Sequence, residues 1–257
     1  MAIRMIASDL DGTLLDSGCR ISAETADAVK MAQRAGIRFM AATGRAWGTV
    51  HSIFQETGIE ADYILLNGAE FRVSSGEVIY QEMIQRNVAE KLMDYLSAMG
   101  MDFEINTAQG DFTTDTNVCQ TASEIQDLSH FWSIGPKILK IFSFSGERTI
   151  VGHVSEYLKG WHGISVTSSA GWNIEITAAA AKKGKMLKRA ADFYQVPAEE
   201  VMVFGDGEND ETMFREFCHS RAVGNAIPMI RSMAEKVIDS NHKNGVAKEI
   251  HKILGGK

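Results

Sequence analysis

The alternation of short apolar runs with helical stretches at both ends of the chain constrains the fold more than any other feature. In the first part of the chain, apolar runs and helical stretches follow one another in the order 3–8, 22–36, 37–42, 46–57 and 63–66. Strands that alternate with helices in this way form a parallel sheet with helices on both faces. The same pattern returns after residue 183. The two ends of the chain therefore predict an α/β fold with a Rossmann-like, doubly wound parallel sheet.

The middle of the chain has a different pattern. After a hairpin at 71–80, the expected helices and strands alternate irregularly: helices at 87–99, 118–130 and 147–159, and strands near 101–106, 112–116, 137–144, 163–168 and 172–177. This mixture predicts a separate α+β module. The expected organisation is a discontinuous core, residues 1–82 and 183–257, with an inserted domain at 83–182.

Composition excludes several classes of function. The chain has 257 residues, of which 45% are hydrophobic and 23% charged, as in ordinary globular proteins. Its net charge of -7 gives no overall attraction to nucleic acid or to an anionic membrane. No apolar run approaches the length of a membrane span, about 20 residues, and there is no pattern of a signal peptide. Three widely spaced cysteines indicate neither a disulfide framework nor a zinc site. We expect a cytoplasmic protein without nucleic-acid or membrane partners.

The run Asp9-Leu10-Asp11-Gly12-Thr13 follows the first apolar stretch directly. Side chains two residues apart on an extended chain point to the same side, so Asp9 and Asp11 face one site. Gly12 allows a sharp turn beside them. Of two converging carboxylates, one can attack or bind a metal while the other moves a proton. The alternative interpretation is a strand end at which Asp and Gly serve only as turn residues.

Polar residues follow three of the expected parallel strands at the point where each one ends. These segments are Asp9 with Asp11, Thr43-Gly44-Arg45, and Gly205-Asp206-Gly207-Glu208-Asn209-Asp210. Ligands of open parallel sheets bind outside the carboxyl ends of the strands, so these segments are expected to meet. Clustered carboxylates need a cation, and hard oxygen ligands suit Mg²⁺. Thr43, the Gly44 N–H and Lys183 before a helix can bind phosphate. The pattern predicts a site for phosphoryl transfer.

At this point the sequence resembles a known family. The four motifs of the haloacid dehalogenase superfamily are matched in order by Asp9-Leu10-Asp11-Gly12-Thr13-Leu14-Leu15, Thr43-Gly44-Arg45, Lys183-Gly184 and Gly205-Asp206-Gly207-Glu208-Asn209-Asp210. More narrowly, the chain resembles the Cof-type phosphatases in Asn67-Gly68-Ala69, Val223-Gly224-Asn225-Ala226, Asp239-Ser240-Asn241 and Asn244-Gly245-Val246-Ala247. The resemblance covers the whole chain.

The resemblance implies a role for each matching residue. Asp9 is implied as the nucleophile that forms an aspartyl-phosphate, and Asp11 as the group that protonates the leaving oxygen and then activates water. The Asp9 carboxylate, the Asp11 backbone carbonyl and Asp206 are implied as Mg²⁺ ligands. The implied phosphate-binding residues are Thr43, Gly44, Arg45, Lys183 and Asn209. Asp210 and Asn67 are implied as supporting residues, and the insert as a type-2 (C2B) cap that closes over the substrate.

Some assignments have alternatives. Lys183 matches the motif lysine, but the family's usual Gly and Ser or Asp before it are replaced by Ala178-Ala179-Ala180-Ala181, and Lys182 is the second candidate. Arg45 either reaches a phosphate or caps its own turn, and Asn67 either lines the site or forms a strand-end turn.

The predicted function is a Mg²⁺-dependent phosphatase acting on phosphomonoesters of small metabolites. Sugar phosphates, pyridoxal phosphate and flavin mononucleotide are the substrates that the resemblance implies. Two alternatives stay open: a sugar phosphomutase built on the same core, and a non-catalytic protein that binds phosphorylated metabolites. We expect a monomer or a small homo-oligomer.

Overall fold

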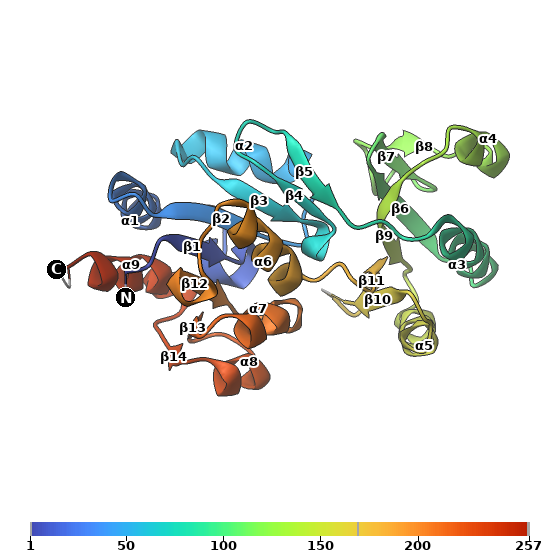
Figure 1. Ribbon diagram of the computed structural model, residues 1–257. Helices are drawn as coiled ribbons and strands as arrows, with labels where there is room; N and C mark the ends of the chain where they lie inside the picture. The colour runs from blue at the N-terminus through green and yellow to red at the C-terminus, as the bar shows by residue number, and fades with distance from the viewer. Residues whose placement is uncertain (1, 169, 256–257) are drawn as a thin grey trace. The chain divides into compact units, whose positions relative to one another are not determined.

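The computed structural model describes residues 2–168 and 170–255. Contacts along the chain divide it into two compact units (Figure 1). The first, here called the core unit, comprises Met1–Tyr80 and Lys182–Lys257, and the second, the inserted unit, comprises Gln81–Ala181. The chain thus leaves the core unit once and returns to it.

The core unit is built on an eight-stranded sheet in the order β14-β13-β12-β1-β2-β3-β4-β5. Its strands are β1 (Met5–Ser8), β2 (Arg38–Ala42), β3 (Asp62–Leu65), β4 (Glu70–Arg72), β5 (Val78–Gln81), β12 (Val201–Gly205), β13 (His219–Ala222) and β14 (Lys236–Val237). The six strands from β14 to β3 pair in parallel, and β4 runs antiparallel to β3. From β1 the chain proceeds outward in one direction, and from β12 in the other. In such sheets this switch of direction marks the ligand-binding edge.

The described part of this unit contains six α-helices: α1 (Ala23–Arg34), α2 (Trp47–Thr57), α6 (Lys183–Phe193), α7 (Glu211–Glu216), α8 (Pro228–Met233) and α9 (Gly245–Gly255). Helix α1 packs against α9, and α6 against α7. All four residues of β1 are buried, as expected for a strand in the middle of a covered sheet. The predicted α/β fold with a parallel sheet is confirmed.

Local sequence explains where these helices begin and end. The Ser22 side chain accepts a hydrogen bond from the Thr25 N–H and caps the start of α1. Helix α2 ends at Gly58, whose left-handed conformation (φ +65°) satisfies the last turn. Such start and stop signals help to set the lengths of the crossovers that return the chain to the sheet.

The inserted unit contains a six-stranded sheet in the order β10-β11-β9-β6-β7-β8. Its strands are β6 (Asp102–Thr107), β7 (Gly110–Thr113), β8 (Ser123–Glu124), β9 (Ile138–Phe144), β10 (Ile164–Thr167) and β11 (Asn173–Ala178), and its helices are α3 (Arg86–Ala98), α4 (Leu128–Ser133) and α5 (Arg148–Lys159). Helix α3 contacts β6 and β9, and α5 contacts β10 and β11. The unit is an α+β module of its own.

One sequence prediction for this unit is wrong. The helix expected at 118–130 is replaced by the short strand β8 and by α4, which begins only at Leu128. The polar stretch before Asp127 has no apolar stripe that a helix would bury. Asp127 instead caps α4, since its carboxylate accepts hydrogen bonds from the Ser129 and His130 N–H groups.

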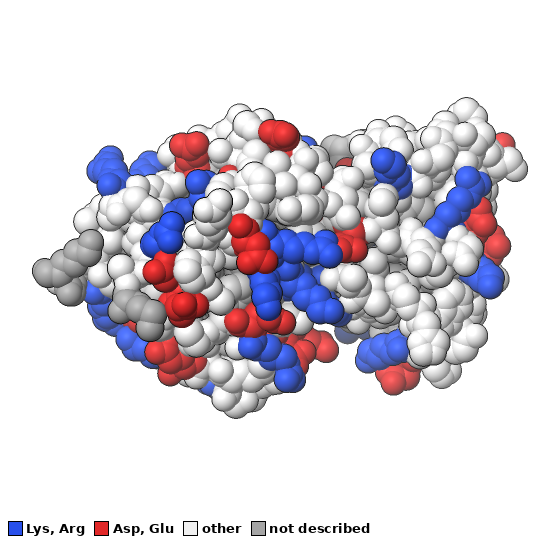
Figure 2. Space-filling model, viewed as in Figure 1, with Lys and Arg blue, Asp and Glu red and all other residues white. Residues whose placement is uncertain are grey.

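The surface carries charges of both signs. On the face shown in Figure 2, Lys and Arg side chains lie beside Asp and Glu side chains. Among the described residues, no helix combines the length and the apolar character needed to cross a bilayer.

Candidate active site

Asp9 lies directly after β1, in the middle of the core sheet. Its backbone N–H donates to the Phe204 carbonyl at 3.0 Å, which continues the pairing of β1 with β12. The chain then turns sharply over Leu10–Leu14, where Gly12 takes a φ of +82°. Asp9 is 4% exposed, so its carboxylate sits inside the protein at the carboxyl end of the strand.

Lys183 connects Asp9 to the fourth motif. It is the first residue of α6 and is fully buried. Its Nζ atom lies 2.6 Å from Asp9 Oδ1 and 2.7 Å from Asp210 Oδ1. The Gly184 N–H donates to Thr212 Oγ1, which attaches the start of α6 to α7. The motif lysine in contact with the nucleophile candidate is therefore Lys183, and Lys182 is only half-buried beside it.

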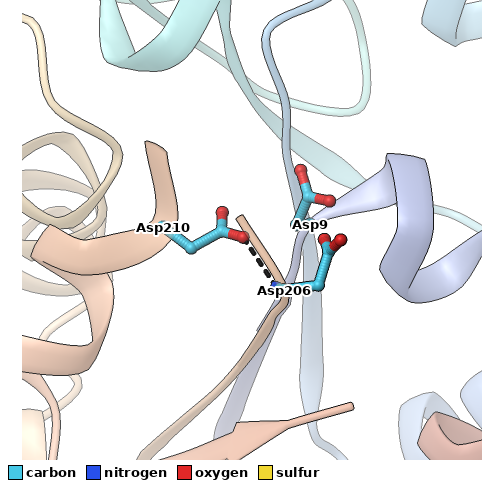
Figure 3. Close-up of side chains that lie close together, drawn as sticks. All are labelled: Asp9, Asp206 and Asp210. Atoms are coloured by element: carbon cyan, nitrogen blue, oxygen red, sulfur yellow. Dashed lines mark hydrogen bonds between the residues drawn. The ribbon is translucent and has the colours of Figure 1, made fainter. Parts of the chain in front are cut away.

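Asp206 and Asp210 have different environments, although they are four residues apart. Asp210 Oδ2 accepts hydrogen bonds from the Asp206 and Gly207 N–H groups, at 2.9 and 3.0 Å, and closes the loop after β12. Asp206 Oδ1 accepts a hydrogen bond from Thr13 Oγ1 at 2.9 Å. Figure 3 shows the carboxylates of Asp9 and Asp206 next to each other, with Asp210 reaching toward the backbone of Asp206. Asp210 thus has both oxygens occupied by the protein.

The titration of these groups reflects their burial and their mutual repulsion. Burial, opposed by the charge of Lys183 and reinforced by Asp210 and Asp206, raises the pKa of Asp9 well above its ordinary value. Burial and the charge of Asp210 raise the pKa of Asp206 to about 6. Burial alone would lower the pKa of Lys183, but Asp210 and Asp9 outweigh it and raise that pKa. The lysine therefore stays charged, while Asp9 and Asp206 resist ionisation.

The donor set fits a hard divalent cation. One carboxylate oxygen from each of Asp9, Asp206 and Asp210 lies within 4.8 Å of the others. When all three are ionised, the single ammonium of Lys183 leaves an excess of two negative charges in a buried place. A divalent cation would neutralise that excess, and carboxylate oxygens are the ligands that Mg²⁺ prefers. Because Asp210 is committed to Lys183 and to the loop, Asp9 and Asp206 are the side chains suited to hold the ion.

The second motif lies beside these acids at the ends of β2 and β3. Thr43 is fully buried, and its Oγ1 accepts a hydrogen bond from the Arg45 N–H at 3.1 Å. Asn67 has a left-handed backbone (φ +58°), and its N–H donates to the Thr43 carbonyl. Its Oδ1 accepts a hydrogen bond from Asn209 Nδ2 at 3.0 Å. Asn67 is thus both a strand-end turn residue and a support for Asn209.

Asp11 and Arg45 form a separate pair. Arg45 Nε donates to Asp11 Oδ2 at 2.8 Å, and an Nη atom donates to Asp11 Oδ1. The Asp11 side chain is 52% exposed, in contrast to buried Asp9. Asp11 therefore presents a carboxylate to solvent while Asp9 sits in the interior.

Sequence reasoning missed the residues that shape the loop after β1. Asn225 Nδ2 donates to the Gly12 carbonyl at 2.7 Å, and Asn225 Oδ1 accepts from the Asn241 N–H. Asn241 Nδ2 donates to the Leu15 carbonyl at 2.8 Å. Both asparagines stand in segments that carried the resemblance, so their presence was a signal, but no role had been assigned to them. With Thr13, they connect the loop to the segments that follow β12, β13 and β14.

The chain matches a known protein family over most of its length. The model of the haloacid dehalogenase-like hydrolase family matches residues 6–250. The chain therefore belongs to the haloacid dehalogenase-like hydrolases, and its relatives place it among the Cof-type phosphatases of that superfamily.

Two curated proteins and one solved structure illustrate the likeness. Phosphatase YwpJ of Bacillus subtilis is 30% identical over 98% of this chain and 100% of its own. The 5-amino-6-(5-phospho-D-ribitylamino)uracil phosphatase YwtE of the same organism is 29% identical over 99% of each. The structure of a haloacid dehalogenase-like hydrolase from B. subtilis is 28% identical and covers 98% of this chain and 99% of its own, with a TM-score of 0.87. The likeness extends over the inserted unit as well as the core.

Proposed function

We propose that the protein is a Mg²⁺-dependent phosphatase that hydrolyses phosphomonoesters of small metabolites through an aspartyl-phosphate on Asp9. The observation that carries the proposal is the buried Lys183 ammonium, which contacts Asp9 and Asp210 beside Asp206. A lone structural ion pair would need one acid. Three acids around one lysine, at the carboxyl edge of a parallel sheet, support a site that binds a cation and a phosphate together.

The reaction has two halves. In the first, an Asp9 carboxylate oxygen attacks phosphorus, the bond from phosphorus to the leaving oxygen breaks, and Asp11 gives its proton to that oxygen. In the second, a water oxygen attacks the phosphorus of the aspartyl-phosphate while Asp11 takes a proton from the water. The acyl–phosphate bond breaks, and Asp9 is regenerated with release of inorganic phosphate. Asp11 begins each turnover protonated and ends it protonated.

The remaining residues bind and orient the phosphate. Asp9, Asp206 and the Asp11 backbone carbonyl would hold Mg²⁺, which supplies charge neutralisation for the transferring phosphoryl group. Lys183 keeps Asp9 in place and offers positive charge where negative charge develops. Thr43, the Gly44 N–H and Asn209 are proposed as phosphate ligands, since they belong to the loops that follow β2 and β12. Asp210 fixes Lys183 and the Asp206 loop.

The proposed substrates are phosphate esters of alcohols. The relative YwtE acts on 5-amino-6-(5-phospho-D-ribitylamino)uracil, an ester on a sugar alcohol. Sugar phosphates, pyridoxal phosphate and flavin mononucleotide belong to the same chemical class, in which the leaving alkoxide is basic and needs a proton. We propose that the inserted domain, residues 83–182, acts as a type-2 cap that selects among them and excludes water during transfer.

The test is phosphate release from a panel of these esters, with Mg²⁺ and with EDTA. The proposal expects Mg²⁺-dependent release by the unaltered protein and none by Asp9→Asn. Asp27→Asn, at an exposed acid on α1, is the matched control and should retain activity. A phosphoenzyme that is stable to acid and cleaved by hydroxylamine would identify the acyl-phosphate, and it should be absent from Asp9→Asn. Isomerised sugar phosphate without inorganic phosphate, or binding without turnover, would contradict the proposal.

A further inference from the structure

The Arg45 side chain binds the Asp11 carboxylate through two hydrogen bonds. The two hydrogen bonds run from Nε to Oδ2 at 2.8 Å and from an Nη atom to Oδ1. A planar guanidinium bound in this way fixes both the position of a carboxylate and the direction of its plane. Among the described residues, no other side chain is hydrogen-bonded to the Asp11 carboxylate. Arg45 is therefore what determines the conformation of a side chain that is half exposed.

The backbone of Arg45 is itself held by two hydrogen bonds. The Arg45 N–H donates to Thr43 Oγ1, and the Arg45 carbonyl accepts a hydrogen bond from the Leu66 N–H at 3.2 Å. The side chain is only 24% exposed. The hydrogen bond to Asp11 raises the pKa of Arg45 above its ordinary value. The Arg45 backbone is thus fixed in the loop after β2, and its side chain binds Asp11 in the loop after β1.

Asp11 lacks the supports that fix the other acids. Asp9 is 4% exposed and contacts Lys183, and Asp210 is fully buried with both oxygens occupied. An exposed aspartate without such contacts exchanges rotamers on a timescale of picoseconds to nanoseconds. Proton transfer needs the donor oxygen within hydrogen-bond reach of the leaving oxygen. A carboxyl group that exchanges among rotamers spends much of its time too far from the leaving oxygen to form that hydrogen bond.

We propose that Arg45 is a positioning residue for Asp11, rather than a residue that binds the transferring phosphate. The inference rests on the proposed function, in which Asp11 donates its proton to the leaving oxygen. Arg45 holds the ionised Asp11 side chain through both oxygens before substrate arrives. When Asp11 takes up its proton, the protonated oxygen gives up its hydrogen bond to Arg45, and the other oxygen keeps its bond and holds the side chain in place. Its contribution is then specific to leaving groups that need a proton.

The two roles make different predictions for the choice of substrate. A phosphate ligand contributes equally to all phosphomonoesters, because the transferred group is the same. A residue that positions the acid matters most for basic alkoxides and least for aryl leaving groups, which depart as stable anions. The loss on substitution should therefore grow with the basicity of the leaving oxygen, as it does for Asp11 itself.

The experiment compares p-nitrophenyl phosphate with the best alkyl phosphate of the panel, using Arg45→Met, Arg45→Lys and Asp11→Asn. For Arg45→Met, we expect kcat/KM on the alkyl ester to fall at least about tenfold more than on the aryl ester, a part of the 10²–10⁴-fold effect of general acid catalysis. Arg45→Lys should show the same selective loss, because an ammonium cannot make the two-point contact. Arg34→Met, at an exposed arginine of α1, controls for the loss of a surface charge.

A double variant makes the inference sharper. If Arg45 acts through Asp11, Arg45→Met combined with Asp11→Asn should lose no more activity than Asp11→Asn alone. Equal losses on the alkyl and aryl esters, or losses that add in the double variant, would overturn the inference. Asp9→Asn separates this outcome from failure of the proposed function, since only the latter predicts that Asp9→Asn still releases phosphate. Circular dichroism on both Arg45 variants establishes that each is folded.

Discussion

Replacing Lys183 by Met tests the electrostatic balance of the site directly. The ammonium is fully buried and contacts Asp9 Oδ1 at 2.6 Å and Asp210 Oδ1 at 2.7 Å. Methionine fills a similar volume with an apolar chain but leaves three carboxylates facing one another. We expect a large loss of stability together with a loss of turnover.

The size of the loss follows from the geometry. With an effective dielectric constant of about 20, each of these contacts corresponds to roughly 6 kcal/mol of Coulomb attraction. Much of that attraction offsets the cost of removing the charges from water. Measured losses on breaking a buried pair are about 3–5 kcal/mol, because the remaining charge stays buried without compensation. We therefore expect Lys183→Met to lower the free energy of unfolding of the core unit by about 3–5 kcal/mol at pH 7.

The assay is urea unfolding in EDTA, followed by Trp47 fluorescence. Trp47 is the single tryptophan in the core unit, so a background with Phe in place of the other three reports on this unit alone. Lys185→Met, at an exposed position of the same helix, is the control and should cost little. Adding Mg²⁺ should restore part of the stability, because a cation again faces the acids. A loss below about 1 kcal/mol, or one equal to that of Lys185→Met, would refute the reasoning.

Three further predictions follow from the same site. In EDTA, the thermal stability contributed by Asp206 should fall as the pH rises from about 4 to about 6. The pKa of Asp206 is raised from 3.8 to about 6, so the folded state binds that proton more tightly than the unfolded state does. A melting temperature that rises over this pH window would contradict the prediction. Gly12→Ala should weaken Mg²⁺ binding at least about tenfold by calorimetry, since the new Cβ would overlap the Asp206 carboxylate and one such lost contact is worth about 1.4 kcal/mol. Gly36→Ala, with a similar φ of +84° but open space around it, is the control and should bind Mg²⁺ normally. Asn225→Ala should lower kcat/KM roughly tenfold by removing the hydrogen bond to the Gly12 carbonyl, without a change in oligomeric state or in circular dichroism.

The parallel core was predictable because its pattern is local. Start and stop signals that act within a few residues mark the helices between the apolar runs, such as the Ser22 cap at the start of α1 and Gly58 at the end of α2. The rule that parallel strands present their carboxyl ends on one edge then brings the motifs together without knowledge of side-chain geometry. The helix expected at 118–130 failed for the opposite reason. That stretch is polar, and β8 forms only because it pairs with β7, a contact that no local pattern announces.

The sequence did not predict which basic side chain pairs with which aspartate. Four aspartates and two basic residues stand in the motifs, and spacing does not say which pairs form. The structure joins Lys183 to Asp9 and Asp210, and Arg45 to Asp11. Asp206 takes part in no ion pair among the described residues and accepts its hydrogen bond from a neutral hydroxyl. It is therefore the acid whose charge the protein leaves least compensated. An added divalent cation relieves that charge most, which is the physical reason to expect metal binding to respond more to substitution of Asp206 than of Asp210.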